Sequence, residues 1–88
     1  MVSEKIIINC PIGLHLRPAG AVGNEALKYK SDIRMVYHDG NKADMKSMFA
    51  LLGAGIKCGD EIMVTCEGED EKEALEAVVS TLKSSLEA

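Results

Sequence analysis

The chain has 88 residues, which is room for a single domain spanning 1–88. Ten Lys and Arg against 14 Asp and Glu give a net charge of −4, and aromatic residues make up 3% of the chain. A nucleic-acid groove needs an excess of cations and aromatic surfaces for stacking bases, so this composition argues against a nucleic-acid partner. Since no apolar run approaches the roughly 20 residues that a bilayer span requires, we also expect no membrane insertion.

The N-terminus and the cysteines predict a cytoplasmic protein. The apolar run over 6–8 is too short for the core of a signal peptide, and no cleavage motif follows it. Cys10, Cys58 and Cys66 are odd in number and lack CxxC spacing, so neither a disulfide framework nor a zinc site is supported. We expect all three to be small apolar core residues in a reducing cytoplasm.

The N-terminal third of the chain predicts a strand followed by a helix. Apolar and polar residues alternate over 3–10, as in a strand with one covered face, before a proline and a glycine end the run. Over 16–29 the apolar residues recur at helical spacing, and Pro18 is acceptable in the first turn of that helix. Gly20 and Gly23 each weaken the helix by up to about 1 kcal/mol relative to Ala, so we expect packing to hold it.

A hairpin and a short helix come next. A second alternating run over 33–38 and a short strand over 41–44 flank Asp39-Gly40, a dipeptide typical of hairpin turns. Ser47 is a natural N-cap for a short helix that ends near residues 53–55, because its hydroxyl can accept a hydrogen bond from the first turn.

The C-terminal part predicts a fourth strand and the most strongly amphipathic helix. Alternation over 61–67 indicates the strand, and the acidic residues 69–71 suit the positive end of a helix dipole. The apolar face of the last helix consists of Leu75, Val78, Val79, Leu82 and Leu86. The order β-α-β-β-α-β-α predicts an α+β fold. We expect an open-faced two-layer sandwich with three helices on one face of a four-stranded, mostly antiparallel sheet.

The segment 13–19, with the sequence GLHLRPA, is the most informative stretch for chemistry. It places the imidazole of His15 at the start of a helix and the guanidinium of Arg17 two residues later. The free N–H groups and the dipole of a helix N-terminus favour an anion, and Arg17 adds a fork of donors that fits phosphate oxygens. A neutral histidine there can accept a phosphoryl group as a nucleophile. On spacing alone, a capping or turn role for His15 and a solvated Arg17 are the more common alternatives.

Two motifs in this order resemble those of a known family. The first is GLHLRPA, and the second comprises Lys46-Ser47-Met48-Phe49, the glycines that follow it, and Gly59-Asp60-Glu61. They resemble the active-site and regulatory signatures of the HPr family, the histidine phosphocarriers of the bacterial phosphoenolpyruvate:sugar phosphotransferase system. The acidic opening of the last helix over 68–71 is similar as well, so the resemblance covers nearly the whole chain.

The resemblance implies a specific chemistry. His15 accepts a phosphoryl group on Nδ1 from phosphorylated enzyme I and passes it to the A domain of a sugar-specific enzyme II. Arg17 and the backbone amides of the helix start hold the phosphate. No metal and no organic cofactor are implied, and the chain is a phosphorylated intermediate without substrate turnover of its own. We expect it to be a monomer.

The resemblance gives Ser47 a regulatory role in addition to its capping role. In low-GC Gram-positive members the matching serine is phosphorylated by a bifunctional HPr kinase/phosphorylase, and the modified carrier binds catabolite control protein A. A phosphate there adds about −1.5 to −2 charges, which slows transfer to His15 by local repulsion. The two roles of Ser47 are compatible.

The short helix has more apolar residues than it can bury. We expect Leu51 to point inward and an exposed apolar patch to form near His15, with a positive rim from Arg17 and Lys46. The resemblance implies that enzyme I and enzyme II dock on this patch. The expected partner-binding residues are Leu16, Gly20, Lys46, Met48, Phe49 and Leu52.

Three alternative functions stay open. One is an HPr-like regulatory protein that acts mainly through phosphorylation of Ser47 and protein binding; loss of the histidine would indicate that class, and the presence of His15 argues against it. Another is a phosphocarrier that serves a nitrogen-related or other regulatory relay, and the most remote is a small metal-binding domain that uses His15 and the cysteines. His38 has no motif around it, and we expect it to be solvated. It lies beside a turn that is one residue longer than is usual in the family.

Overall fold

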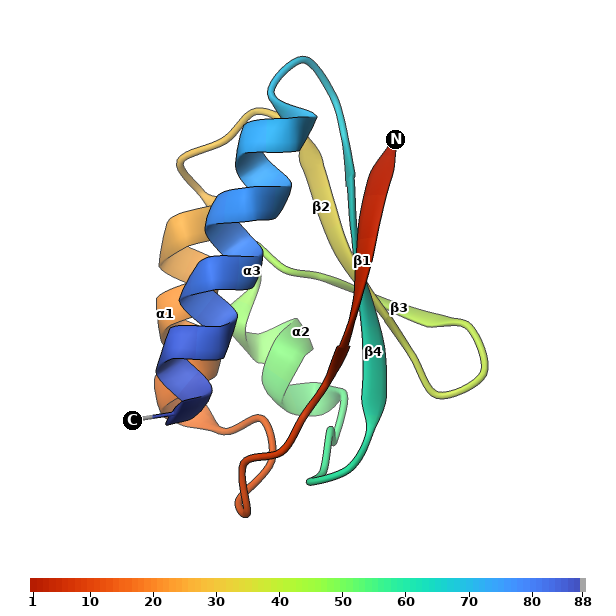
Figure 1. Cartoon of the computed structure of the whole chain (residues 1–88), viewed down its shortest axis with the longest axis vertical. Coiled ribbons are helices and arrows are strands. Elements are labelled where there is room, and N and C mark those ends of the chain that lie inside the picture. Colours follow the sequence, from red (N-terminus) through yellow and green to blue (C-terminus); the bar gives the residue numbers. More distant parts are fainter. Residues whose placement is uncertain (88) are drawn as a thin grey trace.

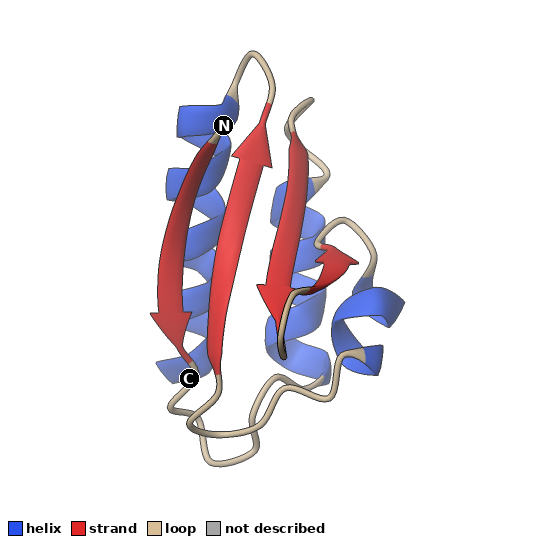
Figure 2. Cartoon of the chain, turned by 90° about the vertical axis from the view of Figure 1, so that its right-hand side faces the viewer, coloured by secondary structure: helices blue, strands red, loops and turns tan. Residues whose placement is uncertain are grey.

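A four-stranded antiparallel sheet with three helices on one of its faces makes up the protein (Figure 1, Figure 2). The computed structural model describes residues 1–87. In chain order the elements are β1 (Val2–Ile7), α1 (Leu16–Ala26), β2 (Asp32–Tyr37), β3 (Asn41–Asp44), α2 (Met48–Gly53), β4 (Glu61–Glu67) and α3 (Glu71–Glu87). Neighbouring strands are antiparallel, in the spatial order β1-β4-β2-β3. The predicted sandwich and its element order are confirmed.

Alternation along the strands directs one set of side chains toward the helices. In the pairing of β1 with β4, Ile6 lies opposite Ile62, and in that of β2 with β4, Met35 lies opposite Val64. All four side chains are buried, while the residues next to them in sequence are more exposed. The helix α3 completes this core with the apolar face expected from its spacing.

Gly20 and Gly23 lie where α1 packs against α2. A Cβ atom on Gly23 would lie 3.8 Å from the carbonyl oxygen of Met45 and 3.9 Å from the amide nitrogen of Met48, at the start of α2. Gly20 faces the same helix, since its Cβ position lies 3.6 Å from the sulfur of Met48. Packing against α2 therefore supports α1 at the two positions where its own helix propensity is weakest.

The loop between β2 and β3 contains one residue more than the predicted Asp39-Gly40 turn. Because Tyr37 pairs with Asn41, the loop consists of His38, Asp39 and Gly40, and the strand ends before His38. All three loop residues have positive φ, at 39°, 57° and 98°. Glycine and short polar residues such as Asp tolerate this left-handed backbone best, and His38 adopts it as part of the longer loop.

Two of the three cysteines lie in the core as predicted, but the prediction is wrong for Cys58. Cys10 and Cys66 are buried, and burial raises the pKa of the Cys66 thiol to about 11. Cys58 is exposed, in the turn that precedes β4. In the described part of the chain, no three His, Cys, Asp or Glu side chains come together as a metal site requires. Within residues 1–87, no helix is long and apolar enough to cross a bilayer.

Candidate functional site

His15 is the N-cap of α1, but its ring does not cap the helix. The backbone is extended there, with φ −119° and ψ −171°, and the His15 carbonyl accepts a hydrogen bond from the N–H of Ala19 at 3.0 Å. The half-buried side chain makes no hydrogen bond to the first turn. Only the backbone of His15 serves the helix, which leaves the imidazole free for chemistry.

The first turn of α1 offers unpaired donors beside this ring. Within residues 1–87, the N–H groups of Leu16 and Arg17 have no hydrogen-bond partner, and Pro18 has no N–H. The Arg17 side chain is exposed and forms no ion pair in the described part of the chain. Free amides, the positive end of a helix dipole and a free guanidinium together favour a phosphate-like anion.

An open hollow contains the His15 ring. It is lined by Cys10, Pro11, Ile12, His15, Leu16, Arg17 and Leu86. Leu86 belongs to the last turn of α3, whereas the other residues belong to the loop before α1 and to its first turn. The hollow opens to solvent, so a partner can reach the imidazole.

The loop before His15 is fixed by the segment that precedes β4. Leu14 is buried, and its N–H donates to the carbonyl of Ile56 at 3.0 Å. Gly13 has a φ of 77°, and a Cβ atom on it would lie 2.9 Å from the Cα of Lys57 and closer still to the carbonyl oxygen of Ile56. Only glycine suits both the left-handed backbone and this close approach, which is the physical reason for the first residue of the GLHLRPA motif.

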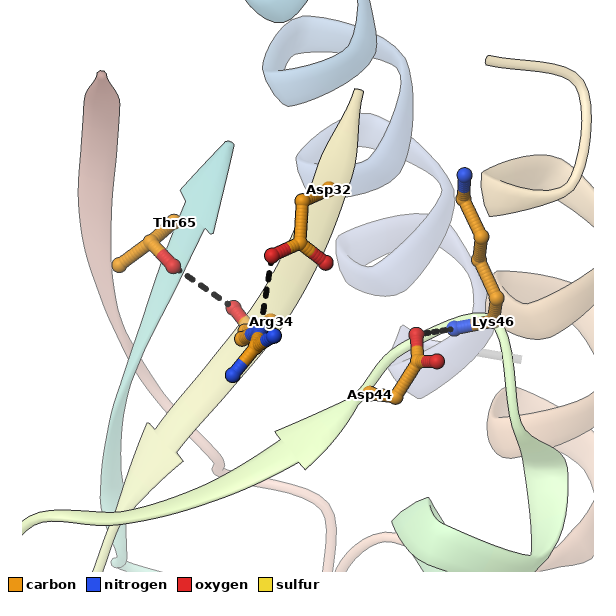
Figure 3. Close-up of polar contacts among 5 residues, drawn as sticks. All are labelled: Asp32, Arg34, Asp44, Lys46 and Thr65. Carbon is orange, nitrogen blue, oxygen red and sulfur yellow. Dashed lines mark hydrogen bonds and ion pairs between the residues drawn. The ribbon is translucent and has the colours of Figure 1, made fainter. Parts of the chain in front are cut away.

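Ser47 caps α2 as predicted, since its Oγ accepts a hydrogen bond from the N–H of Ala50 at 3.2 Å. Asp44 shapes the turn before it by accepting the N–H of Lys46 on Oδ1 at 2.9 Å (Figure 3). The Lys46 ammonium donates to the carbonyl of Tyr29 at 2.8 Å, just beyond the C-terminus of α1. The Lys46 ammonium is therefore bound near the C-terminal end of α1, where the helix dipole favours a cation. Of the two cations expected on the positive rim, only Arg17 is unpaired in the described part of the chain.

The apolar patch on α2 is smaller than expected. Leu51 is buried, as predicted, and Phe49 is 81% exposed. Met48 and Leu52 are half-buried and pack against the core, so the prediction that both are exposed is wrong in part. The reason is helical periodicity, because Met48 lies three residues before the inward Leu51 on the same side of α2, and Leu52 directly follows Leu51.

The helix α1 adds a second part to this surface. Leu16 is 63% exposed and lies one helical turn before Gly20, on the same face of α1. Gly20 lines a groove between α1 and α2 together with Met48 and Lys46. The structure thus brings residues of both helices together on one surface, which begins at the residue that follows His15.

Residues 2–84 match the family described as "PTS HPr component phosphorylation site". The chain belongs to the HPr family. The phosphocarrier protein HPr of Mycoplasma pneumoniae is 38% identical over 83 residues, which is 94% of either chain. The HPr-like protein Crh of Bacillus subtilis is 35% identical over 80 residues, which is 91% of this chain and 93% of Crh.

The fold is that of solved HPr-family structures as well. A mycoplasma histidine-containing phosphocarrier protein has a TM-score of 0.93 at 29% identity, with 97% of this chain and 96% of that one covered. A crystal structure of Bacillus subtilis Crh, described as a dimer with a swapped domain, has a TM-score of 0.75 at 33% identity and covers 96% and 95% of the two chains. The strand order found here is therefore the one shared by the HPr family.

Two aspartates of this HPr-family chain make contacts that the sequence does not indicate. His38 is exposed, as predicted for a solvated side chain, but the prediction missed its partner, because Nε2 of His38 lies 3.0 Å from Oδ2 of Asp60. The carboxylate of Asp70 accepts hydrogen bonds from the N–H groups of Lys30 and Ser31, each at 2.9 Å. Asp60 lies 22 positions from His38 and Asp70 lies 39 from Ser31, so no local pattern could have revealed either contact.

Proposed function

We propose that this chain carries a phosphoryl group from enzyme I to sugar-specific enzymes II in the cytoplasm. Nδ1 of His15 attacks the phosphorus atom on the phosphohistidine of enzyme I, and the bond between that phosphorus and the donor histidine breaks. A histidine of an enzyme II A domain then attacks the same phosphorus, and its bond to His15 breaks. The imidazole is regenerated, so the chain is an intermediate in the transfer.

The free imidazole at the start of α1 carries this proposal. Its ring makes no capping hydrogen bond, and the unpaired N–H groups of Leu16 and Arg17 lie in the adjoining turn. These donors and the guanidinium can hold the negative oxygens of the phosphoryl group both during transfer and while His15 carries it. The same donors therefore serve the charged group in both transfer steps.

The surface beside His15 supports docking of both enzymes. Phe49 is the most exposed large apolar side chain there, and exposed apolar groups next to a reactive residue mark protein contact sites. Leu16 and Gly20 extend the surface along α1, and Met48 contributes the part of its side chain that is not buried. We include Leu52 and the stem of Lys46 at its border, with Arg17 as the cation that meets acidic partner surfaces.

Incubation with enzyme I and phosphoenolpyruvate tests the proposal. Intact-mass measurement is expected to show the gain of one phosphoryl group, which is lost on brief acid treatment because phosphohistidine is acid-labile. The gain should be absent in His15→Ala and present in His38→Ala, the matched control for the other histidine of the chain. A wild-type protein that stays unmodified by several enzymes I, or an unaffected His15→Ala, would contradict the carrier function.

We also propose regulatory phosphorylation at Ser47, which would join this chain to HPr kinase/phosphorylase and catabolite control protein A. The hydroxyl is half-buried and accepts the N–H of Ala50, so a phosphate would have to keep an oxygen at the cap or disturb the first turn of α2. An HPr kinase with ATP is expected to add an acid-stable phosphate to wild type and not to Ser47→Ala. An unmodified wild-type protein would contradict this regulation while leaving the carrier role intact.

A function that is regulatory alone remains the second candidate, since Crh is among the relatives. It predicts a phosphate on Ser47 and none on His15. The unpaired donors around His15 favour the carrier role, because a purely regulatory chain has no need for an anion site at this position.

A further inference from the structure

The loop that carries His15 is held at both of its ends by the segment 56–60. At the first end, the N–H of Ile8 donates to the carbonyl of Asp60 at 2.9 Å, and the N–H of Gly59 donates to the carbonyl of Ile8 at 2.5 Å. At the second end, the N–H of Leu14 donates to the carbonyl of Ile56 at 3.0 Å. The two loops lie at the same end of the molecule, below the sheet in both views (Figure 1, Figure 2).

The side chain of Asp60 determines the shape of this supporting segment. Its Oδ2 accepts the N–H of Lys57 at 2.9 Å, while its own N–H donates to the carbonyl of Lys57 at 3.0 Å. The turn 57–60 is thereby closed by two hydrogen bonds that both involve Asp60. The bond from the Lys57 amide, followed by that from His38, lowers the pKa of the Asp60 carboxyl, so it is ionised at neutral pH.

His38 holds the same carboxylate from another part of the fold. Its Nε2 lies 3.0 Å from Oδ2 of Asp60, across 22 positions in sequence. The side chain belongs to the three-residue β2–β3 loop, and the ring of Tyr37 packs edge-on against it with centroids 5.2 Å apart. The other charged groups that line this area are Lys5, Asp39 and Glu61, and Lys5 and Glu61 pair with each other at 3.7 Å.

We propose that Asp60, held by His38, is a positioning residue for phosphoryl transfer at His15. The carboxylate fixes the turn 57–60, and the backbone of Ile56 and Lys57 at its start then fixes Gly13 and Leu14, which determine where the His15 ring points. The inference rests on the proposed function of His15. A reacting atom displaced by about 1 Å can lose up to about a hundredfold in rate, so a remote support of this kind is measurable.

The rate of phosphoryl transfer from enzyme I, measured against carrier concentration, tests the proposal. Asp60→Ala is expected to lower the turnover at saturating carrier by about three- to tenfold. The KM for the carrier should stay within about twofold, since the docking residues on α1 and α2 are unchanged. Asp60→Asn keeps an oxygen that accepts the Lys57 N–H and should recover most of the turnover, and His38→Asn should lie between wild type and Asp60→Ala.

Asp32→Asn is the matched control. It removes the charge of another carboxylate that has a side-chain partner, the Nε of Arg34 at 2.9 Å, at the opposite end of β2 from His38 (Figure 3). Its turnover and KM should equal those of the wild type. Turnover of Asp60→Ala equal to that of Asp32→Asn would overturn the proposal.

A second measurement does not depend on enzyme I. Amide hydrogen exchange at Leu14 should be faster in Asp60→Ala than in Asp32→Asn, and the ring resonances of His15 should shift. If Asp60→Ala does not fold, Asp60→Glu supplies the test, because its longer side chain keeps the charge but cannot close the turn in the same way. If the variant has the same Leu14 exchange rate and the same His15 resonances as the wild-type protein, the positioning role is overturned. If the wild-type protein itself accepts no phosphoryl group from enzyme I, the proposed function is contradicted.

Discussion

The carboxylate of Asp70 binds Ser31 through both the backbone N–H and the hydroxyl of that serine. The second oxygen of the carboxylate accepts the N–H of Lys30 at 2.9 Å. Ser31 is 1% exposed, and a Cβ atom on Gly68 would lie 2.8 Å from its Cα, so the connection after α1 packs tightly against the start of α3. The acidic residue that the sequence assigns to a helix dipole therefore also joins two segments that lie far apart in the chain.

This contact predicts a pH-dependent contribution to stability. The hydrogen bonds, that of the Ser31 hydroxyl first, lower the pKa of Asp70 below its ordinary value of 3.8. A carboxyl whose pKa is lower in the folded than in the unfolded state stabilises the fold at any pH above its unfolded-state pKa. This stabilisation is lost as the pH falls through the pKa of the folded state. We expect Asp70→Asn to be less stable than wild type at pH 7, with a difference that shrinks as pH falls below about 4.

Urea unfolding from pH 7 down to pH 2 measures this difference. Asp32→Asn is the control, since Asp32 is exposed and pairs only with the neighbouring Arg34 in the described structure. A stability difference for Asp70→Asn that is the same at every pH would show that the charge of Asp70 does not strengthen these hydrogen bonds.

Gly13→Ala tests the close approach beside the His15 loop. The substitution forces a left-handed backbone on alanine, which costs about 1–2 kcal/mol, and also pushes a Cβ atom into the backbone of Ile56. Gly55→Ala separates the two effects, because Gly55 has a φ of 66° but nothing lies within 4 Å of its Cβ position. Gly13→Ala should lose at least about 1 kcal/mol more than Gly55→Ala in chemical unfolding. Equal losses would mean that the loop moves aside freely.

Arg17 is expected to affect the chemical step more than the fold. The guanidinium is exposed and unpaired within residues 1–87, so Arg17→Ala should change the free energy of unfolding by less than about 0.5 kcal/mol. The rate of transfer from enzyme I should fall by about tenfold or more, which corresponds to about 1.4 kcal/mol of lost stabilisation. The transfer rate of Arg17→Lys should lie between those of the wild type and Arg17→Ala, since lysine keeps the charge but lacks the fork of donors. Full activity of Arg17→Ala would assign phosphate binding to the backbone amides alone.

Phe49→Ala tests the docking surface. The ring is 81% exposed, so its removal should leave the free energy of unfolding within about 0.5 kcal/mol of wild type. The KM of enzyme I for the carrier should rise about tenfold, because a large exposed aromatic residue is the strongest candidate for a binding hot spot. Ile7→Ala is the control, since Ile7 is 63% exposed on β1 and outside the proposed surface. An unchanged KM for Phe49→Ala would place the contact elsewhere.

Local patterns predicted each helix and strand and placed His15 and Arg17 at the start of one helix. Two element ends were wrong, since β1 ends at Ile7 and not near residue 10, and α1 ends at Ala26 and not near residue 29. The strand over 41–44, the strand over 61–67 and the cap at Ser47 all depend on residues a few positions apart, and the structure has them where predicted. His15 and Arg17 lie two residues apart, so any helix that starts at this point places both residues beside the free amides of its first turn.

Only the tertiary structure decided which distant segments support that site. The strand order places β4 between β1 and β2, and this brings the segment 56–60 against the loop before His15. The contacts of Asp60 with His38 and of Asp70 with Ser31 join positions 22 and 39 apart, and side-chain periodicity contains no information at such separations. The sequence by itself determined which histidine is the candidate for phosphoryl transfer and that Arg17 follows it in the first turn of the helix. Long-range packing decided how that histidine is held, because backbone groups without a local partner must find one elsewhere in the fold.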